Sequence, residues 1–167
     1  MIIVLLSSCT SQKKESSEQE AITNSEMDVI KKHTLKTLDS LSLKNIQSWK
    51  EYSDLKDFLK IYKEISSREA LNNALELKQL TKLAKDSIDI EELKVPAFKA
   101  RINVFQNEVL RLADMTYIPA ITVREIDLQV KNVFSTFNSL NSKIEHTFRK
   151  KSFDNSVKLD SIFNKMR

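Results

Sequence analysis

The sequence contains no glycine among its 167 residues. Loops that wrap phosphates or dinucleotides need glycine where the backbone approaches the ligand closely or takes a positive φ angle. The strained turn that presents a nucleophilic serine in hydrolases needs it as well. We therefore do not expect a P-loop, a Rossmann site or a nucleophile elbow. Asn-Gly and Asp-Gly hairpins are also missing, so an antiparallel β fold is disfavoured and a helical chain remains.

Cysteine, histidine and proline are scarce as well. The single cysteine, Cys9, cannot form an intrachain disulfide, and it excludes a zinc site built on several cysteines. Helical di-metal centres use Glu-x-x-His, but residue 30 is isoleucine and residue 143 is lysine, so neither His33 nor His146 completes that pattern. We expect both histidines on the surface, and we predict no metal site, no cofactor and no catalytic residue.

The first nine residues combine a short apolar run, two serines and the only cysteine. The segment Leu6-Ser7-Ser8-Cys9 resembles the lipobox of bacterial lipoproteins, which places an aliphatic residue and two small residues before a lipid-bearing cysteine. The resemblance implies that residues 1–8 are a signal peptide. It also implies that Cys9 receives a diacylglycerol group and becomes the first residue of the mature chain. The alternative is a cytosolic chain that begins with aliphatic residues.

Residues 9–26 are expected to be a lipidated cysteine followed by a disordered tether. Only Ala21 and Ile22 are apolar between Thr10 and Glu26, too few to offset the entropy lost on ordering. Thr10, rather than aspartate, follows the cysteine. By analogy with lipoprotein sorting in enteric bacteria, this favours the outer membrane, on its periplasmic face or the cell surface.

Residues 27–167 are predicted to form one helical domain, because apolar residues recur there at helical spacing. A first helical segment, from Ser25 to about Ile65, is expected to break near residues 39–43, where Asp39 or Ser42 can cap a second helix. Ser66 with Glu69 predicts a capping box at the next helix start.

The second half of the chain has the most regular pattern. Pro96 is placed to open a helix whose apolar seam follows spacings of three and four: Phe98, Ile102, Phe105, Val109, Leu112, Thr116. Thr122 with Glu125 predicts another capping box. It precedes a second seam: Val123, Ile126, Val130, Val133, Phe137, Leu140, Ile144. Residues 147–167 either extend this helix or form a short terminal one.

The predicted fold is all-α, an up-down four-helix bundle with an N-terminal helical extension after the tether. Segments of about 20–28 residues joined by short connections favour antiparallel neighbours. An elongated helical hairpin or coiled coil that oligomerises is the second interpretation, since both seams keep a heptad spacing.

One group of charged residues is a candidate for ligand binding. It comprises Arg101, Arg111, Asp114, Arg124 and Asp127, which flank the two seams. Arginine suits bidentate contacts with carboxylate or phosphate, so these residues form either a polar groove for an anionic ligand or ordinary surface ion pairs. Phe134 lies one position off its seam, so we expect it to be partly exposed and available to a partner.

The functional hypothesis is a non-enzymatic structural or protein-interaction module, anchored to the cell envelope through Cys9. Its partner is expected to be another envelope protein or a second copy. The alternative is a small-ligand-binding or chaperone-like helical lipoprotein that uses the bundle interior. The formal net charge is +4, from 27 basic and 23 acidic residues. We do not expect nucleic acid as a partner in that compartment.

Mass spectrometry of the mature amino terminus tests the lipobox. The wild-type chain should begin at Cys9 and carry the mass of its lipid, whereas the Cys9→Ser chain should keep residues 1–8 without lipid. An intact, unmodified wild-type amino terminus from the soluble cell fraction would contradict the prediction.

Overall fold

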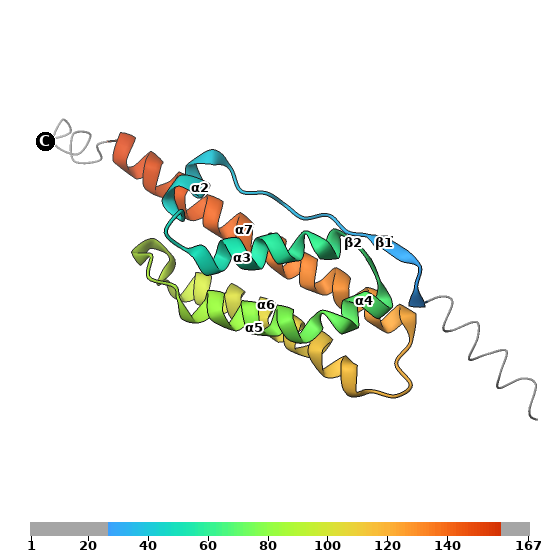
Figure 1. The fold of residues 1–167 in the computed structure, drawn as a ribbon. Helices are drawn as coiled ribbons and strands as arrows, with labels where there is room; N and C mark the ends of the chain where they lie inside the picture. The colour runs from blue at the N-terminus through green and yellow to red at the C-terminus, as the bar shows by residue number, and fades with distance from the viewer. Residues whose placement is uncertain (1–26, 158–167) are drawn as a thin grey trace, which may run out of the picture.

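The computed structural model describes residues 27–157, and the chain between those limits is mostly helical (Figure 1). The helices are α2 (Ser40–Asn45), α3 (Lys50–Leu59), α4 (Ser67–Asn72), α5 (Ala74–Asp86), α6 (Pro96–Asp114) and α7 (Val123–Ser156). Short 3-10 turns span Ile61–Lys63, Glu91–Leu93 and Met115–Tyr117, and the strands are β1 (Ile30–Lys32) and β2 (Glu64–Ser66). The predictions for residues 1–26 and 158–167 lie outside the described residues.

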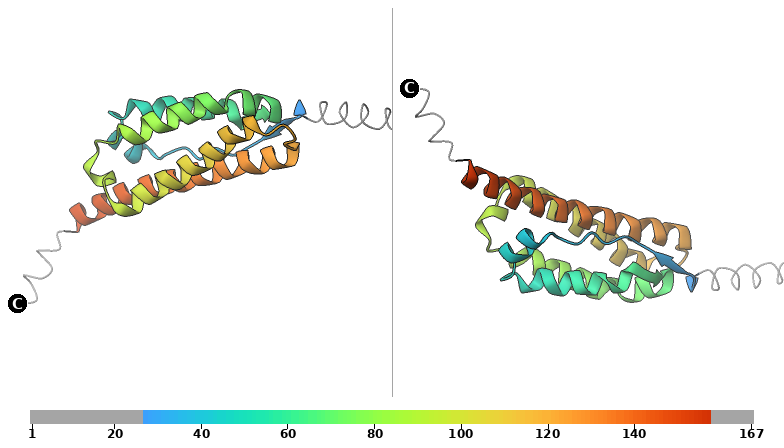
Figure 2. Two further views of the ribbon diagram at one scale, coloured as in Figure 1. Left: turned by 90° about the horizontal axis from the view of Figure 1, so that it is seen from below. Right: turned by 90° about the horizontal axis from the view of Figure 1, so that it is seen from above.

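Four of the helices lie side by side along one long axis. Contacts link α3 to α5, α5 to α6, and α6 to α7, while the shorter α2 and α4 both contact α7. The α5–α6 connection lies at one end of the molecule, and the α6–α7 connection lies at the other, beside β1, β2 and α4 (Figures 1 and 2).

The local start signals read from the sequence are confirmed. Ser66 and Thr122 each form a complete capping box, with Glu69 and Glu125 respectively. Asp39 caps α2, because its side chain accepts a hydrogen bond from the Ser42 backbone N–H. Pro96 occupies the first turn of α6. These side chains satisfy backbone N–H groups that a helix start otherwise leaves without partners.

The core lies between the four long helices and is dominated by aromatic rings. Both predicted seams face it, except that Thr116 lies beyond the end of α6 and Val123 is only partly buried. Phe137 of α7 contacts two other rings, with centroid distances of 5.9 Å to Tyr52 and 5.3 Å to Phe105. Trp49 packs against Tyr52 and donates its indole N–H to the Ala84 carbonyl.

The predicted N-terminal helical extension is wrong. The residues before Ser40 include the strand β1 and an extended segment, residues 33–39, which we call the strap. An extended chain rises about 3.3 Å per residue and a helix only 1.5 Å, so the ten residues of β1 and the strap reach along the bundle only when extended. The predicted break near residues 39–43 is present, but the second helix, predicted to run through Trp49 to about Ile65, is itself interrupted. It is divided into α2 and α3, and β2 follows Ile61–Lys63.

The strap lies between α3 and α7 and closes that side of the core (Figure 2). It continues from the antiparallel pair in which Ile30, Lys31 and Lys32 of β1 face Ser66, Ile65 and Glu64 of β2. Leu38 of the strap is buried and Leu35 packs against the core. The strap therefore supplies apolar side chains where a direct α3–α7 contact would otherwise be needed.

Truncating Phe137 to alanine should lower the free energy of unfolding by about 3–5 kcal/mol, because the ring is fully buried and contacts two others. Leu128→Ala on the same helix removes an exposed side chain and should change it by less than about 0.5 kcal/mol. Urea denaturation measures both. Equal losses in the two variants would contradict this core assignment.

Candidate functional site: the strap anchor on α7

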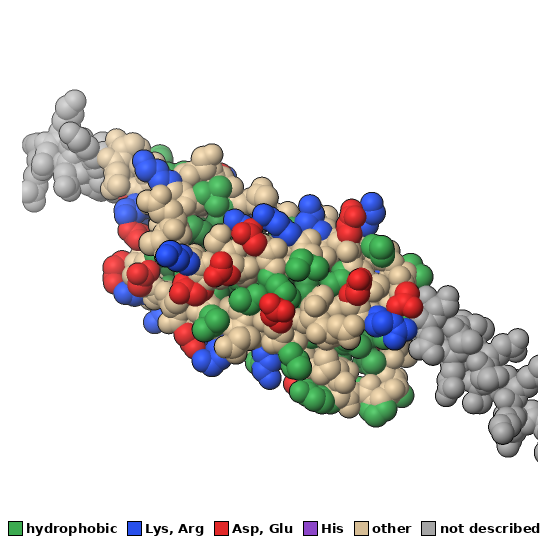
Figure 3. Space-filling view, in the orientation of Figure 1, with side chains coloured by type: hydrophobic (Ala, Val, Ile, Leu, Met, Phe, Trp, Pro, Cys, Tyr) green, Lys and Arg blue, Asp and Glu red, His purple; other side chains and the backbone are tan. Residues whose placement is uncertain are grey.

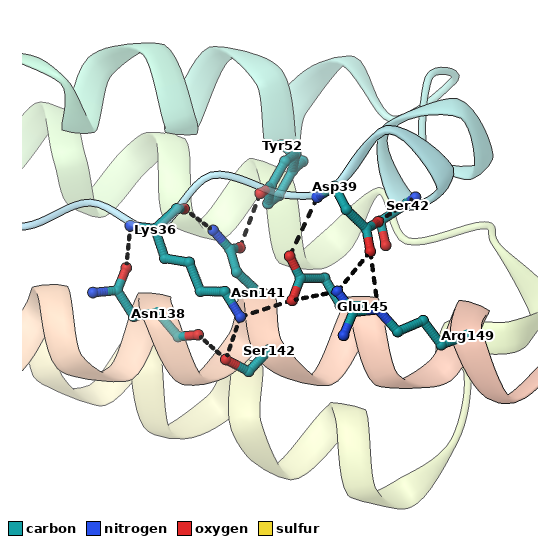
Figure 4. Close-up of polar contacts among 9 residues, drawn as sticks. All are labelled: Lys36, Asp39, Ser42, Tyr52, Asn138, Asn141, Ser142, Glu145 and Arg149. Carbon is teal, nitrogen blue, oxygen red and sulfur yellow. Dashed lines mark hydrogen bonds and ion pairs between the residues drawn. The ribbon is translucent and has the colours of Figure 1, made fainter.

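A stripe of polar side chains on α7 faces the strap (Figure 4). Asn138, Asn141 and Glu145 follow one another at spacings of three and four residues, so they share one face of the helix. Each sits one position after a buried residue of the α7 seam. The stripe therefore borders the core without entering its apolar centre, and Asn141 and Glu145 are nonetheless buried.

These three side chains bind the backbone of the strap. The Lys36 N–H donates to Oδ1 of Asn138 at 2.8 Å, and the Asn138 amide donates to the Thr34 carbonyl at 2.9 Å. The Asn141 amide donates to the Lys36 carbonyl at 2.8 Å, and the Asp39 N–H donates to Oε1 of Glu145 at 3.2 Å. Backbone groups that a second strand would pair are thus satisfied by helix side chains.

Asn141 connects three parts of the fold. While its amide holds the strap, its Oδ1 accepts a hydrogen bond of 2.9 Å from the Tyr52 hydroxyl of α3. Burial raises the pKa of Tyr52, so its hydroxyl stays protonated and continues to donate. Losing the asparagine would leave a buried hydroxyl and a backbone carbonyl unpaired.

Charged groups reinforce the same contact. Nζ of Lys36 lies 2.7 Å from Oε2 of Glu145 and 3.0 Å from Oγ of Ser142. Arg149 donates through Nε and Nη2 to Oδ2 of Asp39 at 3.0 and 2.9 Å. The buried Glu145 carboxylate therefore accepts hydrogen bonds from the strap's backbone and from its lysine, as a buried charge requires.

His33 and Phe134 form the other half of the strap contact. Their rings stack with centroids 5.1 Å apart and planes inclined by 11°. Phe134 is only 3% exposed, so the prediction of a partly exposed partner contact is wrong, because the strap covers it. His33 is half-buried rather than a surface residue, whereas His146 is exposed as predicted. Burial lowers the pKa of His33, and nearby Asp127 partly opposes that shift.

The structure does not bring the five predicted groove residues together. Arg101 donates a hydrogen bond to the Ala97 carbonyl on its own helix, and Nη1 of Arg111 lies 3.5 Å from Oε1 of Glu108. Asp127 pairs with Lys31 of β1 at 3.4 Å and accepts a hydrogen bond from Ser67 of α4.

The other two groove residues, Asp114 and Arg124, are exposed at the end of α6 and the start of α7. Arg101 instead lines a surface hollow of about 300 Å³ with four residues of α7: Ser139, Ser142, Lys143 and His146.

A larger pocket of about 410 Å³ lies between the end of α5 and the start of α6. Its lining combines three lysines with an aliphatic floor: Lys85, Lys94, Lys99, Ile88, Leu93 and Ile102. Nζ of Lys85 donates a hydrogen bond to Gln106, and Nζ of Lys94 donates one to Glu91. Within residues 27–157, no three histidine, cysteine or carboxylate side chains are placed to hold a metal ion.

The comparisons with known proteins add no relative. No protein family model matches the chain, and searches of curated proteins and of solved structures return no significant match. In the part of the chain that the structure describes, none of the helices is both long enough and apolar enough to cross a membrane.

The strap anchor was missed at the sequence level, although the α7 pattern contained a signal for it. Asparagine is a poor residue for a helix interior, and two of them stand one position after seam residues in the most regular helix of the chain. Such a stripe beside a seam indicates that α7 forms hydrogen bonds with a segment packed against it. It does not indicate which segment of the chain that is.

The His33 contact predicts weaker binding of the strap in mild acid. Because burial lowers the pKa of His33 from 6.5, the unfolded chain binds a proton first as the pH falls below that value. The free energy of unfolding should therefore fall between pH 7.5 and pH 5.5. The His33→Phe variant keeps the stack and should lose this part of the pH dependence.

Urea denaturation at both pH values measures the effect, with His146→Gln as the matched control at an exposed histidine. The control should keep the wild-type pH dependence. A His33→Phe chain that loses as much stability in acid as the wild type would show that His33 does not sense pH through its burial.

Proposed function

We propose that this chain is a lipid-anchored helical protein of the cell envelope, acting as a non-enzymatic structural or protein-interaction module. In this proposal Cys9 carries the lipid, residues 9–26 are the tether, and the outer membrane is the site. We propose to classify the fold as an up-down four-helix bundle in which the strap fills the side between α3 and α7. Its partner is an envelope protein or a second copy of the chain.

The observation that carries the proposal is the way the N-terminal segment joins the domain. The first described residues enter through β1, and the strap then runs along the longest helix under four backbone hydrogen bonds from α7 side chains. A force applied at the N-terminus would act on these hydrogen bonds and on the β1–β2 pair. Such a connection suits a domain that is attached to a membrane through its N-terminal end.

The outer face of α5 supports an interaction role. Leu75 and Leu83 are eight residues apart, so they lie on the same side of the helix, and both are nearly half-exposed. Space-filling colours show apolar patches among the charges over this part of the surface (Figure 3). Two exposed leucines on one helix face offer apolar contact points to a helix from a partner.

The alternative, a binder of small ligands inside the bundle, has less support. Trp49, Phe98, Phe105 and Phe137 occupy the space between the long helices and are buried. The 410 Å³ pocket lies at the α5–α6 end and is lined by three lysines together with aliphatic side chains.

Site-specific photo-crosslinking in intact cells tests the interaction role. A photoreactive residue at Leu83 of the full chain should give a discrete crosslinked species in the membrane fraction, and Leu75→Gln should reduce it severalfold. The same residue at Asn103, which is exposed on α6, serves as the matched control and should give none. A chain that fractionates with membranes yet yields no species from position 83 would contradict the α5 face.

A further inference from the structure

The connection between α6 and α7 is unusually apolar for an exposed loop. Residues 117–121 read Tyr-Ile-Pro-Ala-Ile, and no charged residue occurs from Met115 to Val123. Tyr117 is 72% exposed, Ile118 is 49% exposed, and Pro119 and Ala120 are exposed as well. A run of exposed apolar residues weakens solubility and calls for a functional reason.

The fold places this loop at the same end of the molecule as the start of the described chain (Figures 1 and 2). The turn Met115–Tyr117 contacts α4, and Asp28 pairs with Arg68 of α4 at 2.7 Å. Val29, just before β1, and Ile30, its first residue, add exposed apolar side chains to this end. We call Val29, Ile30 and residues 117–121 the apolar tip; green side chains at this end are visible in Figure 3.

The opposite end of the molecule differs in chemistry. The α5–α6 connection, residues 87–95, carries four charged residues: Asp89, Glu91, Glu92 and Lys94. Lys94 pairs with Glu91, and Lys151 of α7 pairs with Glu92. The two connections thus differ in polarity, and the polar connection lies at the end farther from the start of the described chain (Figure 1).

We propose that the apolar tip rests in the interfacial region of the lipid bilayer, which orients the domain with its α5–α6 end away from the membrane. This inference rests on the proposed lipid anchor. Cys9 precedes Met27 by eighteen residues, a reach of at most about 60 Å when fully extended. A chain anchored at Cys9 therefore keeps the Met27 end of the domain within about 60 Å of the bilayer.

The chemistry of the tip favours lipid over a protein partner. Tyrosine concentrates at membrane interfaces, where its ring is apolar and its hydroxyl stays wet, and aliphatic neighbours enter the acyl boundary. Arg124, exposed just after the loop, adds a guanidinium group that can pair with lipid phosphates. Each tip side chain adds little alone, but an existing anchor makes the second contact intramolecular.

Tryptophan quenching in vesicles tests the tip. The full chain is coupled through its only cysteine, Cys9, to a maleimide lipid in phosphatidylcholine–phosphatidylglycerol vesicles, so the test does not depend on lipidation in the cell. Ile118→Trp places a fluorophore at the tip, and Val104→Trp places one at an equally exposed site on the flank of α6. Buried Trp49 gives the same background in both.

Brominated lipids should quench Ile118→Trp strongly and leave Val104→Trp at the level of the wild type. Tyr117→Trp should reproduce the quenching, which guards against a folding defect in one variant. A second comparison uses the Cys9→Ser chain, which cannot be coupled to lipid. Adding Tyr117→Gln/Ile118→Gln to that chain should weaken its binding to vesicles about tenfold, a loss comparable to the free energy of burying one aliphatic side chain. No quenching at either tip position, or equal quenching at position 104, would overturn the proposal.

Two further outcomes separate this inference from neighbouring ones. Sedimentation in which the wild type is a dimer and Tyr117→Gln/Ile118→Gln is a monomer would make the tip an interface between two copies and overturn the lipid contact. An unmodified Cys9 in cells would refute the proposed anchor, while quenching in the coupled vesicles would still show a membrane-binding tip.

Discussion

The fold depends on one side-chain amide. Asn141 is completely buried and gives both ends of its amide to groups from other elements, the Lys36 carbonyl of the strap and the Tyr52 hydroxyl of α3. Without this bridge, the strap would lose a backbone partner, and the side of the core between α3 and α7 would open. A buried polar network of this kind fixes one arrangement because any alternative leaves its members unpaired.

The strap links the proposed anchor to the rest of the molecule. Its hydrogen bonds run along α7, the longest helix, and β1 ties its beginning to β2. The N-terminal part of the domain is therefore bound to the core along its whole length, and its start lies beside the α6–α7 loop. In the proposed function, the lipid-bearing tether leads directly into the segment that completes the core, so the attachment point is continuous with the strap.

The sequence was most informative where the structural signal is local. The capping pairs Ser66–Glu69 and Thr122–Glu125 and the seams of α6 and α7 predicted helices that the structure contains, because these depend on neighbours a few residues apart. The strap could not be found this way. Leu35 and Leu38 fit a helical stripe, but the partners that hold the strap extended lie more than 100 residues later in the chain. Tertiary hydrogen bonds override local preference there.

The candidate sites show the same limit. Arg101, Arg111 and Asp127 were grouped because they flank the seams, yet both arginines have their partners on α6 itself and Asp127 pairs with Lys31 of β1. Conversely, Asn138, Asn141 and Glu145 share one helix face that the sequence contains, but their role became visible only with the strap in place. Periodicity predicts which residues share a helix face, whereas only the fold shows which segment of the chain covers that face.

Hydrogen exchange of the strap in Asn141→Ala tests this account most directly. The account predicts that residues 33–39 exchange much faster than in the wild type and that the free energy of unfolding falls by roughly 2–4 kcal/mol, since two buried groups lose their partner. Asn103→Ala, at an exposed asparagine of α6, should match the wild type in both measurements. Unchanged protection of the strap in Asn141→Ala would contradict the central role of that amide.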